Sequence, residues 1–459
     1  MRSDPDMSAD ARPINATIVG AGSMFTQVLV ADLLNLAGGN GGRLNLVDID
    51  AARLQTMGEL VQRTVDTICG DADWEVCRYT DRREALSGSD FIIVTIEVNG
   101  LDCVGFDNDI PASYGVDQCI GDTIGPGGVF KGLRTIPVFL DILKDAEAMC
   151  PNALVLNYTN PMSMLCLAAS QVSPMSVVGL CHSVQATSKL LAKRAQVPYD
   201  EMHWECAGIN HLAWFTRLRH NGQDLYPDLM QMAKNDLNDC PANIDDAGDL
   251  VRKDMMVNFG AFITESSGHL SEYLPYYRSD DTALRTYCGP AHDGESRFYA
   301  NHWPGRRKEH DARRQKMLSG DEPINQEMSH EYASHIIDAV TNRGEFSFHG
   351  NVANRDGSGS ALIGNLQKEG IVEVECIASH LGIQPTKFGD LPAQMAAICR
   401  SNMSVYELAV EAAINSNKEA AIHALMLDPL CAATCTPSQI REMTLDLFEA
   451  EANFLPGFD

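Results

Sequence analysis

A cysteine and a histidine are placed where they could bind a metal ion together. Cys181 and His182 lie in GLCHSVQAT, where an apolar run ends and a helix-like segment begins. His211, in GINHLAWF, falls at a break between two strand-like runs. A thiolate and an imidazole can together hold a divalent metal. Buried cysteines are common and usually inert, so residue chemistry alone favours core packing for Cys181. For His182, His203 and His269, the alternative to a role in the chemistry is an imidazole that is hydrogen-bonded in the core or exposed to solvent.

A glycine-rich turn near the N-terminus could bind a nucleotide. ATIVGAGSMF ends an apolar run, and a helix-like TQVLVADLLNL follows. Gly20 permits a tight turn, and Gly22 lets a pyrophosphate approach the backbone at a helix N-terminus. Phe25 replaces the third glycine of the usual fingerprint, so a plain strand-to-helix turn is the alternative. The next apolar run ends in NLVDID, where Asp48 could bind a ribose 2′-hydroxyl, which favours NAD+ over NADP+.

The residues that could do chemistry follow short apolar runs that we expect to be strands. These runs are rich in Val and Ile and alternate with helix-like stretches, including 128–149 and 162–171. Strands alternating with helices form parallel sheets, and ligands bind at the carboxyl edge of such sheets. The sequence therefore predicts an α/β fold with a Rossmann-like, doubly wound parallel sheet in residues 13–200, with strands at 16–19, 44–47, 74–79, 91–96, 153–157 and 177–180.

The pattern changes after about residue 199. Two strand-like runs, 205–209 and 212–219, are followed by an Asn-Gly turn signal and then by a mixed region rich in Tyr, Ser and Gly. Helical periodicity then dominates in 327–342, 391–427 (with a candidate break near 415–417) and 437–454. We expect a second α+β domain over 201–459, in a lactate/malate dehydrogenase-like architecture, and a flexible polar tail over 1–12.

Charge and composition exclude some partners. The net charge of −27 argues against nucleic acid and anionic membranes, because phosphate contacts need clustered Lys and Arg. No apolar run is long enough to span a bilayer, and the first residues lack the apolar middle of a signal peptide. The fourteen cysteines are scattered, with no paired framework. Reduced thiols in a cytoplasmic protein are therefore expected.

Several separate motifs occur in one order along the chain. Together they resemble glycoside hydrolase family 4, the NAD- and metal-dependent glycosidases. The resemblance runs from near the N-terminus to about Arg278, with weaker support in the helical tail. The motifs are GAGSMFT (20–26), Asp48, a GPGG loop, NYTNP (157–161), CHSV (181–184), GINH (208–211) and SEYLPYY.

This resemblance implies a redox route to glycoside cleavage, instead of the usual pair of carboxylates. NAD+ would take a hydride from C3 of the sugar, which makes the C2 proton acidic. A divalent metal would act as a Lewis acid and stabilise the negative charge that forms when the C2 proton leaves. Mn2+ is the expected ion, and other divalent metals are alternatives. A base would remove the C2 proton, the C1–O bond would break by elimination, water would add, and the hydride would return.

The family's functional residues map onto positions of this chain. Cys181 and His211 would hold the metal, and Tyr273 would be the base. Asn160 would touch the sugar hydroxyls, and a turn asparagine before Pro161 is its alternative. The resemblance also implies a dimer or tetramer. The remaining assignments are cofactor contacts for Gly20, Gly22, Ser23, Met24, Phe25, Asp48 and Glu97, and substrate contacts for Asn157 and Arg297.

The sequence does not decide which residue is the general acid or which sugar is the substrate. Members specific for phosphorylated α-glucosides carry an Asp after the ligand cysteine, whereas this chain has His182. We expect the acid to be His182, Asp122 or Glu272, in that order. The CHSV motif is most similar to the α-galactosidase branch, with α-galacturonides and α-glucosides as alternatives. An anionic sugar would need an arginine, for which Arg278 and Arg297 are candidates.

Two other functions remain as alternatives. A simple NAD-dependent 2-hydroxy acid dehydrogenase would share the nucleotide-binding half, but it would produce NADH and need no thiolate and metal. A nucleotide-sensing protein without catalysis would not need Cys181, His211 or Tyr273.

Overall fold

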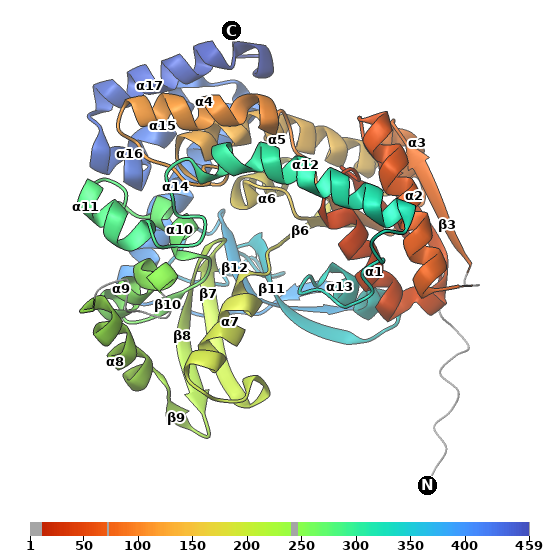
Figure 1. Cartoon of the computed structure of the whole chain (residues 1–459), viewed down its shortest axis with the longest axis horizontal. Helices are drawn as coiled ribbons and strands as arrows, with labels where there is room; N and C mark the ends of the chain where they lie inside the picture. Colours follow the sequence, from red (N-terminus) through yellow and green to blue (C-terminus); the bar gives the residue numbers. More distant parts are fainter. Residues whose placement is uncertain (1–11, 71–72, 240–246, 459) are drawn as a thin grey trace.

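The computed structural model describes residues 12–70, 73–239 and 247–458, so the expected polar tail at 1–12 lies outside it except for Arg12. The described chain is built on one continuous mixed sheet of 13 strands, with helices covering it (Figure 1). The strands are β1 Ile14–Val19, β2 Gly42–Val47, β3 Trp74–Tyr79, β4 Phe91–Val94, β5 Leu154–Asn157, β6 Ser176–Leu180, β7 Met202–Ile209, β8 Leu212–His220, β9 Gln223–Asp224, β10 Phe262–Ile263, β11 Glu345–Ala353, β12 Ile371–Ser379 and β13 Gly382–Pro385.

Helices follow most of these strands. The α-helices are α1 Phe25–Ala37, α2 Ala51–Ile68, α3 Arg82–Leu86, α4 Gly100–Ser113, α5 Gly125–Met149, α6 Met162–Val172, α7 Ser183–Arg194, α8 Tyr226–Leu237, α9 Leu250–Phe259, α10 Ser267–Leu270, α11 Asp281–Ala283, α12 Phe298–Ser319, α13 Ala333–Thr341, α14 Ala393–Asn415, α15 Lys418–Leu427, α16 Pro429–Thr434 and α17 Pro437–Ala450. A short 3-10 turn, η5, covers Ser271–Tyr273.

The first half has the expected doubly wound arrangement. Strands β3, β2, β1, β4, β5 and β6 lie side by side in that order and are all parallel. The central strands β4 and β5 are buried along their whole length, as apolar strands covered on both faces must be. The order reverses between β1 and β4, and ligands bind outside the carboxyl ends of strands at such a point. The fold therefore predicts a cavity beside the loop that follows β1.

The second half extends the same sheet. Strand β11 pairs antiparallel with β6, and β12 joins β11 to β7, so residues 345–379 lie between the two halves of the chain (Figure 1). No strand was expected there. Helices α12, α13 and α14 return to pack against α2, α1 and α5 of the first half. The proposed boundary near residue 200 remains a prediction, because this sheet and these helices cross it.

One helix begins later than its sequence pattern predicted. The periodicity favoured a helix over 327–342, but α13 starts at Ala333. The backbone N–H of Ser329 donates to Asp32 Oδ1 of α1 at 2.9 Å, and its hydroxyl donates to the other carboxylate oxygen. These tertiary hydrogen bonds hold the segment before Ala333 in an irregular, non-helical form, so the expectation was wrong for those residues. The long helix α12 was not expected either.

The described residues contain no helix that is both long enough and apolar enough to cross a membrane. Their thirteen cysteines are all unpaired. Ten of these are buried, and only Cys69, Cys77 and Cys181 are partly accessible. Cys181 therefore differs from the cysteines that simply fill the core.

A buried histidine should make stability depend on pH. His349 Nε2 lies 3.1 Å from the Cys206 carbonyl, and its ring stacks on Trp204. Burial lowers the pKa of His349 from 6.5 to about 4. The unfolded chain therefore takes up this proton first as pH falls, and stability is lost from about pH 6.5 downward. Urea unfolding at pH 7 and pH 5 should show a wild-type loss about 2 kcal/mol larger than in His349→Gln.

The exposed His203 offers a matched control for this measurement. The variant His203→Gln should keep the wild-type dependence on pH. Equal pH dependence in the wild type and His349→Gln would show that His349 is not the group responsible.

Candidate active site

A cavity of about 500 Å³ lies at the carboxyl edge of the parallel strands, at the predicted reversal of strand order. All seven predicted cofactor residues line it, together with two residues assigned to chemistry at the sugar, Asp122 and Asn160. Helix α12 supplies much of the remaining wall. The residues expected to contact the cofactor are Gly20, Gly22, Ser23, Met24, Phe25, Asp48 and Glu97.

The glycine loop leaves no room for a side chain at Gly20 and little room at Gly22. Gly20 has φ +86°, and a Cβ there would lie 2.6 Å from the Thr95 carbonyl oxygen. A Cβ on Gly22 would lie 2.8 Å from Asp48 Oδ2, which accepts the Gly22 N–H at 2.7 Å. This leaves backbone at the start of α1 open to the cavity, as a pyrophosphate requires. Phe25, in place of the third glycine, stacks on Tyr158 at 6.0 Å and lines the cavity.

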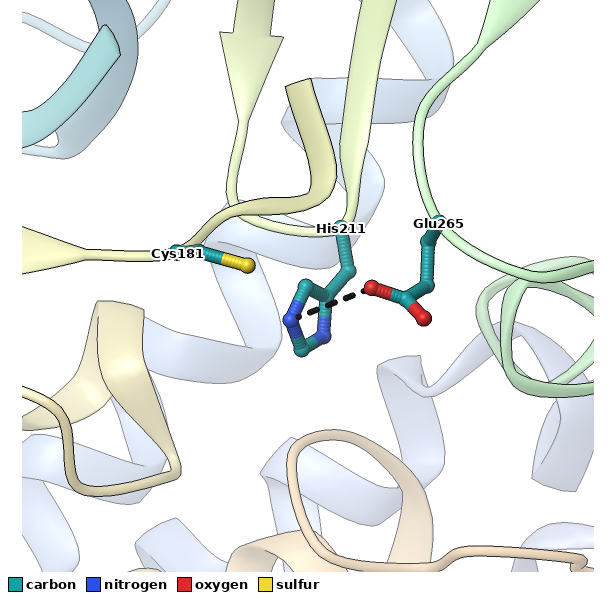
Figure 2. Close-up of side chains that lie close together, drawn as sticks. All are labelled: Cys181, His211 and Glu265. Atoms are coloured by element: carbon teal, nitrogen blue, oxygen red, sulfur yellow. Dashed lines mark ion pairs between the residues drawn. The ribbon is translucent and has the colours of Figure 1, made fainter. Parts of the chain in front are cut away.

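Three side chains from different parts of the chain meet beside this cavity. Cys181 follows β6, His211 occupies the turn between β7 and β8, and Glu265 follows β10, and Figure 2 shows the three pointing toward one another. One ligand atom of each lies within 4.8 Å of the other two. His211 Nε2 is 3.4 Å from Glu265 Oε2. A thiolate, an imidazole and a carboxylate at this spacing form a candidate site for a divalent metal.

The backbone around this site is strained where the ligands sit. His211 and Glu265 have positive φ values of 61° and 74°, which side chains larger than glycine rarely adopt. The pairing of Ile209 with Leu212 leaves a two-residue turn, and this turn holds His211 at the end of the hairpin. Such strain persists only where the surrounding structure imposes it, and it is concentrated at functional sites.

The electrostatics of the three residues favour a bound cation. Burial, together with the nearby negative charges of Glu373 and Glu265, raises the pKa of Cys181 to about 12. Burial also opposes ionisation of Glu265, but His211 and His269 lower its pKa to about 2. Glu265 is therefore a carboxylate at neutral pH, whereas the thiol of Cys181 needs added positive charge to ionise. A divalent ion would supply that charge, because metal binding releases the ligand proton.

Tyr273 contacts the other nitrogen of His211. Its hydroxyl lies 3.1 Å from His211 Nδ1, and its ring is fully buried. Burial raises the pKa of Tyr273 well above its usual value. The predicted base thus lies next to a predicted metal ligand, and the imidazole connects the two.

A hydrogen-bonded and ionic chain connects the metal site to the cavity. Asn160 Nδ2 donates to Asp122 Oδ2 at 3.2 Å, and Lys131 Nζ lies 3.6 Å from the same oxygen. The other Asp122 oxygen lies 3.7 Å from His269 Nε2, and His269 Nδ1 lies 3.9 Å from Glu265 Oε1. Asp122 and Asn160 line the cavity, so these contacts bring the cavity and the metal site into one continuous region.

The three candidate acids differ in their surroundings. His182 Nδ1 lies 2.9 Å from Glu331 Oε1, and that hydrogen bond raises the pKa of His182 to about 9. Burial raises the pKa of Asp122, but Lys131 and His269 outweigh burial and keep it well below its usual value. Asp122 is therefore ionised at neutral pH.

Glu272 is held by the backbone. Burial raises the pKa of Glu272 to about 7, although Arg278 and the backbone N–H groups of Cys119 and Gly121 favour the carboxylate and lower it. Its Oε1 accepts N–H groups from three consecutive residues, 119 to 121, at 2.9 to 3.2 Å. This fixes the loop that presents Asp122 to the cavity.

Three predicted substrate contacts lie elsewhere. Asn157 is fully buried, and its amide donates to the Thr159 carbonyl and to Met162 sulfur, so it shapes a turn. Arg297 does not line the cavity, and its guanidinium pairs with Asp109 at the surface. Arg278 is buried and donates to the carboxylate of Asp117 and the carbonyl of Gly294. The structure brings none of these side chains to the cavity.

Some residues of this site were not singled out from the sequence. Glu265 lies inside the Tyr-, Ser- and Gly-rich loop that was noted, but its contact with His211 depends on the pairing of β8 with β10. Lys131 lies in α5 just after the GPGG loop, and it holds Glu97 at 3.3 Å. The burial of this lysine between two acidic residues depends on the tertiary structure, so no local pattern in the sequence indicates it.

Comparisons with known proteins show which family this chain resembles. The model of the Family 4 glycosyl hydrolases matches residues 15–197, and the model of that family's C-terminal domain matches residues 206–431. The chain is 37% identical over 447 residues to an alpha-galactosidase of Bacillus subtilis, covering 96% of this chain and 99% of that one. It is 33% identical to an alpha-galactosidase of Rhizobium meliloti, covering 96% and 89%.

A solved structure shows the same fold. The crystal structure of a 6-phospho-alpha-glucosidase from gut microorganisms, in complex with NAD and Mn2+, superposes with a TM-score of 0.78 at 22% identity, covering 97% of this chain and 99% of that one. The matches to both family models, and relatives above 30% identity over nearly the whole chain, identify the family. The chain belongs to the family 4 glycosyl hydrolases, and it is a glycoside hydrolase.

Proposed function

We propose that this protein is an α-galactosidase that depends on NAD+ and a divalent metal, with Mn2+ as the expected ion. The observation that carries the proposal is the meeting of Cys181, His211 and Glu265 beside the cavity lined by the glycine loop. A fold with only a nucleotide cavity would suit a dehydrogenase, whereas the added thiolate-containing metal site suits family 4 chemistry.

The residues of the site fit both the metal ion and the dinucleotide. The metal would be held by the Sγ of Cys181, the Nε2 of His211 and a carboxylate oxygen of Glu265, and it would act as a Lewis acid toward sugar oxygens. A thiolate is a soft ligand for manganese, so loose binding and sensitivity to oxidation are expected. The dinucleotide would lie against Gly20, Gly22 and Asp48 and would accept and return a hydride.

Tyr273 is the proposed base, and His211 prepares it. When the Nε2 lone pair of His211 serves as a ligand, Nδ1 carries the ring proton and donates it toward the Tyr273 hydroxyl oxygen, 3.1 Å away. A hydrogen bond to the charged form of an acid lowers its pKa. This contact therefore favours the phenolate that must take the C2 proton.

His182 is the proposed acid for the departing group. Its side chain is 52% exposed and follows Cys181 directly, so it can reach both the site and solvent. The carboxylate of Glu331 holds the ring through Nδ1, which leaves Nε2 to donate a proton. Asp122, ionised between Lys131 and His269, is suited to accept hydrogen bonds from sugar hydroxyls beside Asn160.

The sugar is assigned from the relatives and from the cavity. Both relatives described above are α-galactosidases. The two arginines considered for a uronate, Arg278 and Arg297, are engaged elsewhere. We therefore favour a neutral α-galactoside over an α-galacturonide or α-glucoside.

A panel of three p-nitrophenyl glycosides tests the proposal. The α-galactoside should release p-nitrophenol faster than the α-glucoside and α-galacturonide, and only with NAD+, Mn2+ and a thiol reductant all present. Withholding NAD+ or Mn2+ should abolish release, because the C3 oxidation and its Lewis-acid support are then missing. Deuterium from solvent should appear at C2 of the galactose product.

The alternatives give different results in the same assay. Net NADH accumulation with a hydroxy acid, and no glycoside cleavage, would identify a dehydrogenase. Full glycosidase activity without NAD+ would exclude the redox route, because direct displacement needs no hydride acceptor.

A further inference from the structure

Helix α12 turns a charged face toward the cavity. Surface helices normally bury an apolar stripe. In α12, however, Trp303, Arg307, His310, Asp311 and Arg314 follow one another at helical spacing, and all line the cavity. Burying charged groups costs free energy unless something compensates them. Arg314 is buried and the other four residues are partly exposed, so this face is placed to contact a ligand in the cavity and not to fill the core.

Both ends of α12 are tied to the nucleotide-binding half. The backbone N–H of Tyr299 donates to the Cys119 carbonyl at 2.8 Å, close to Asp122. At the other end, Arg63 of α2 donates to the Leu318 carbonyl at 2.7 Å. Figure 1 shows α12 running from the region of α4 and α5 to α2. The helix is thus held along the length of the cavity.

Arg314 is the most buried residue of this face. Only 7% of it is exposed, and its Nη1 donates to Asp311 Oδ1 at 3.0 Å. Asp311 already accepts two hydrogen bonds from Arg53 of α2, at 2.7 and 2.8 Å. The second terminal nitrogen of Arg314, Nη2, is buried and has no hydrogen-bond partner. Two guanidinium groups therefore share one carboxylate, and one buried donor lacks an acceptor.

Neighbouring groups add positive charge and a second free donor. Burial lowers the pKa of Arg314, and the positive charges of Arg53 and Arg307 lower it further. The indole N–H of Trp303, which also lines the cavity, is buried without an acceptor. The nearby carboxylate of Asp48 already accepts the backbone N–H groups of Gly22 and residue 50. Two buried donors on this face, Arg314 Nη2 and the Trp303 indole, therefore lack an acceptor, and an oxyanion bound between the arginines would supply one.

We propose that Arg314, with Arg53 and Arg307, forms a phosphate-binding site for the dinucleotide, and that α12 is part of the cofactor site. Guanidinium groups bind phosphate oxygens with paired, charge-assisted hydrogen bonds. Arg53 lies beside the glycine loop, since a Cβ on Gly22 would be 3.3 Å from its Cβ. This inference rests on the proposed use of a nicotinamide dinucleotide as cofactor.

Two phosphate groups could occupy the site. One is the diphosphate, which NAD+ and NADP+ share, and the other is the 2′-phosphate, which only NADP+ carries. Isothermal titration calorimetry with each dinucleotide distinguishes them. A diphosphate site predicts that losing Arg314 weakens both ligands equally, and a 2′-phosphate site predicts that only NADP+ loses affinity.

The test compares Arg314→Met with Arg313→Met on the same helix. Arg313 is exposed and pairs with Glu322, so its removal changes the same charge away from the cavity. Arg314→Met should raise the dissociation constant for at least one dinucleotide about 10-fold to 100-fold. Arg313→Met should change it by less than about twofold. If Arg314→Met fails to fold, as thermal melting would show, Arg307→Met on the same face should give the same kind of loss.

The possible failures separate this inference from the proposed function. If the wild type binds NAD+ and the cavity-face variants bind both dinucleotides as well as the wild type does, this inference is wrong and the proposed function stands. Equal weakening by Arg313→Met would also overturn it, because the effect would then be one of overall charge. If the wild type binds neither dinucleotide, both proposals fall.

Discussion

Replacing Cys181 with alanine is expected to lower kcat/KM for p-nitrophenyl α-galactoside about a thousandfold or more. The thiolate is one of three ligand atoms that lie within 4.8 Å of one another. Its loss leaves His211 and Glu265, which are too few to hold a cation firmly. Lewis-acid stabilisation of the transition state contributes several kcal/mol, and about 4 kcal/mol corresponds to a factor of a thousand.

Metal content and activity should fall together in this variant. Elemental analysis should find Mn2+ in the wild type and little in Cys181→Ala, and EDTA should inactivate the wild type until Mn2+ is restored. The matched control is Cys69→Ser, because Cys69 is also partly accessible but lies at the end of α2, away from the ligands. It should keep wild-type activity. Full activity in Cys181→Ala would remove the metal site from the proposal.

Replacing Tyr273 with phenylalanine is expected to lower kcat by about 10²-fold to 10⁴-fold, the usual contribution of a positioned base. The ring would still fill the buried space, so the fold and the metal site should remain intact. Only the hydroxyl, 3.1 Å from His211 Nδ1, is removed. Without it, the C2 proton has no acceptor beside the metal ligand, and the chemical step should be slow.

The assays should separate chemistry from binding. Mn2+ content and NAD+ affinity should stay within about twofold of the wild type in Tyr273→Phe, because neither depends on the hydroxyl. The rate at which solvent deuterium enters C2 of the product should fall in proportion to kcat. Tyr276→Phe is the control, because Tyr276 is in the same loop and is 48% exposed. If Tyr276→Phe loses activity and Tyr273→Phe does not, the base has been assigned to the wrong tyrosine.

The effect on His211 connects these two predictions. One imidazole contacts Glu265 through Nε2 and Tyr273 through Nδ1. A change at the metal site should therefore also alter the base, so the losses from Cys181→Ala and Tyr273→Phe should not be additive in the double variant.

The local sequence determined the nucleotide half with good accuracy. Strands β1 to β6 begin and end within two residues of their predicted limits. Their apolar composition reflects burial on both faces, which is a local requirement at every position. The glycine loop and Asp48 were also predicted from the sequence, because a side chain at Gly20 would clash with the backbone of Thr95 and one at Gly22 would crowd the Asp48 carboxylate.

Only the tertiary structure decided which side chains face the site. Three ligand atoms from β6, the β7–β8 turn and the segment after β10 meet because distant strands pair in one sheet. The same pairing placed β11 and β12 between the two halves. No single stretch of sequence encodes these contacts, since each segment carries only one partner of the pair.

Helix α12 is a second feature that the sequence pattern did not predict. Its cavity face is charged, so periodicity of apolar residues, the usual signal for a helix, is absent. Conversely, Arg297 and Asn157 carry side chains suited to a sugar, but the fold gives them other partners. Residue type and spacing along the chain thus established the chemistry available to this protein. The sheet and the helices packed on it determined which of those residues share one cavity, because that choice depends on contacts between residues far apart in sequence.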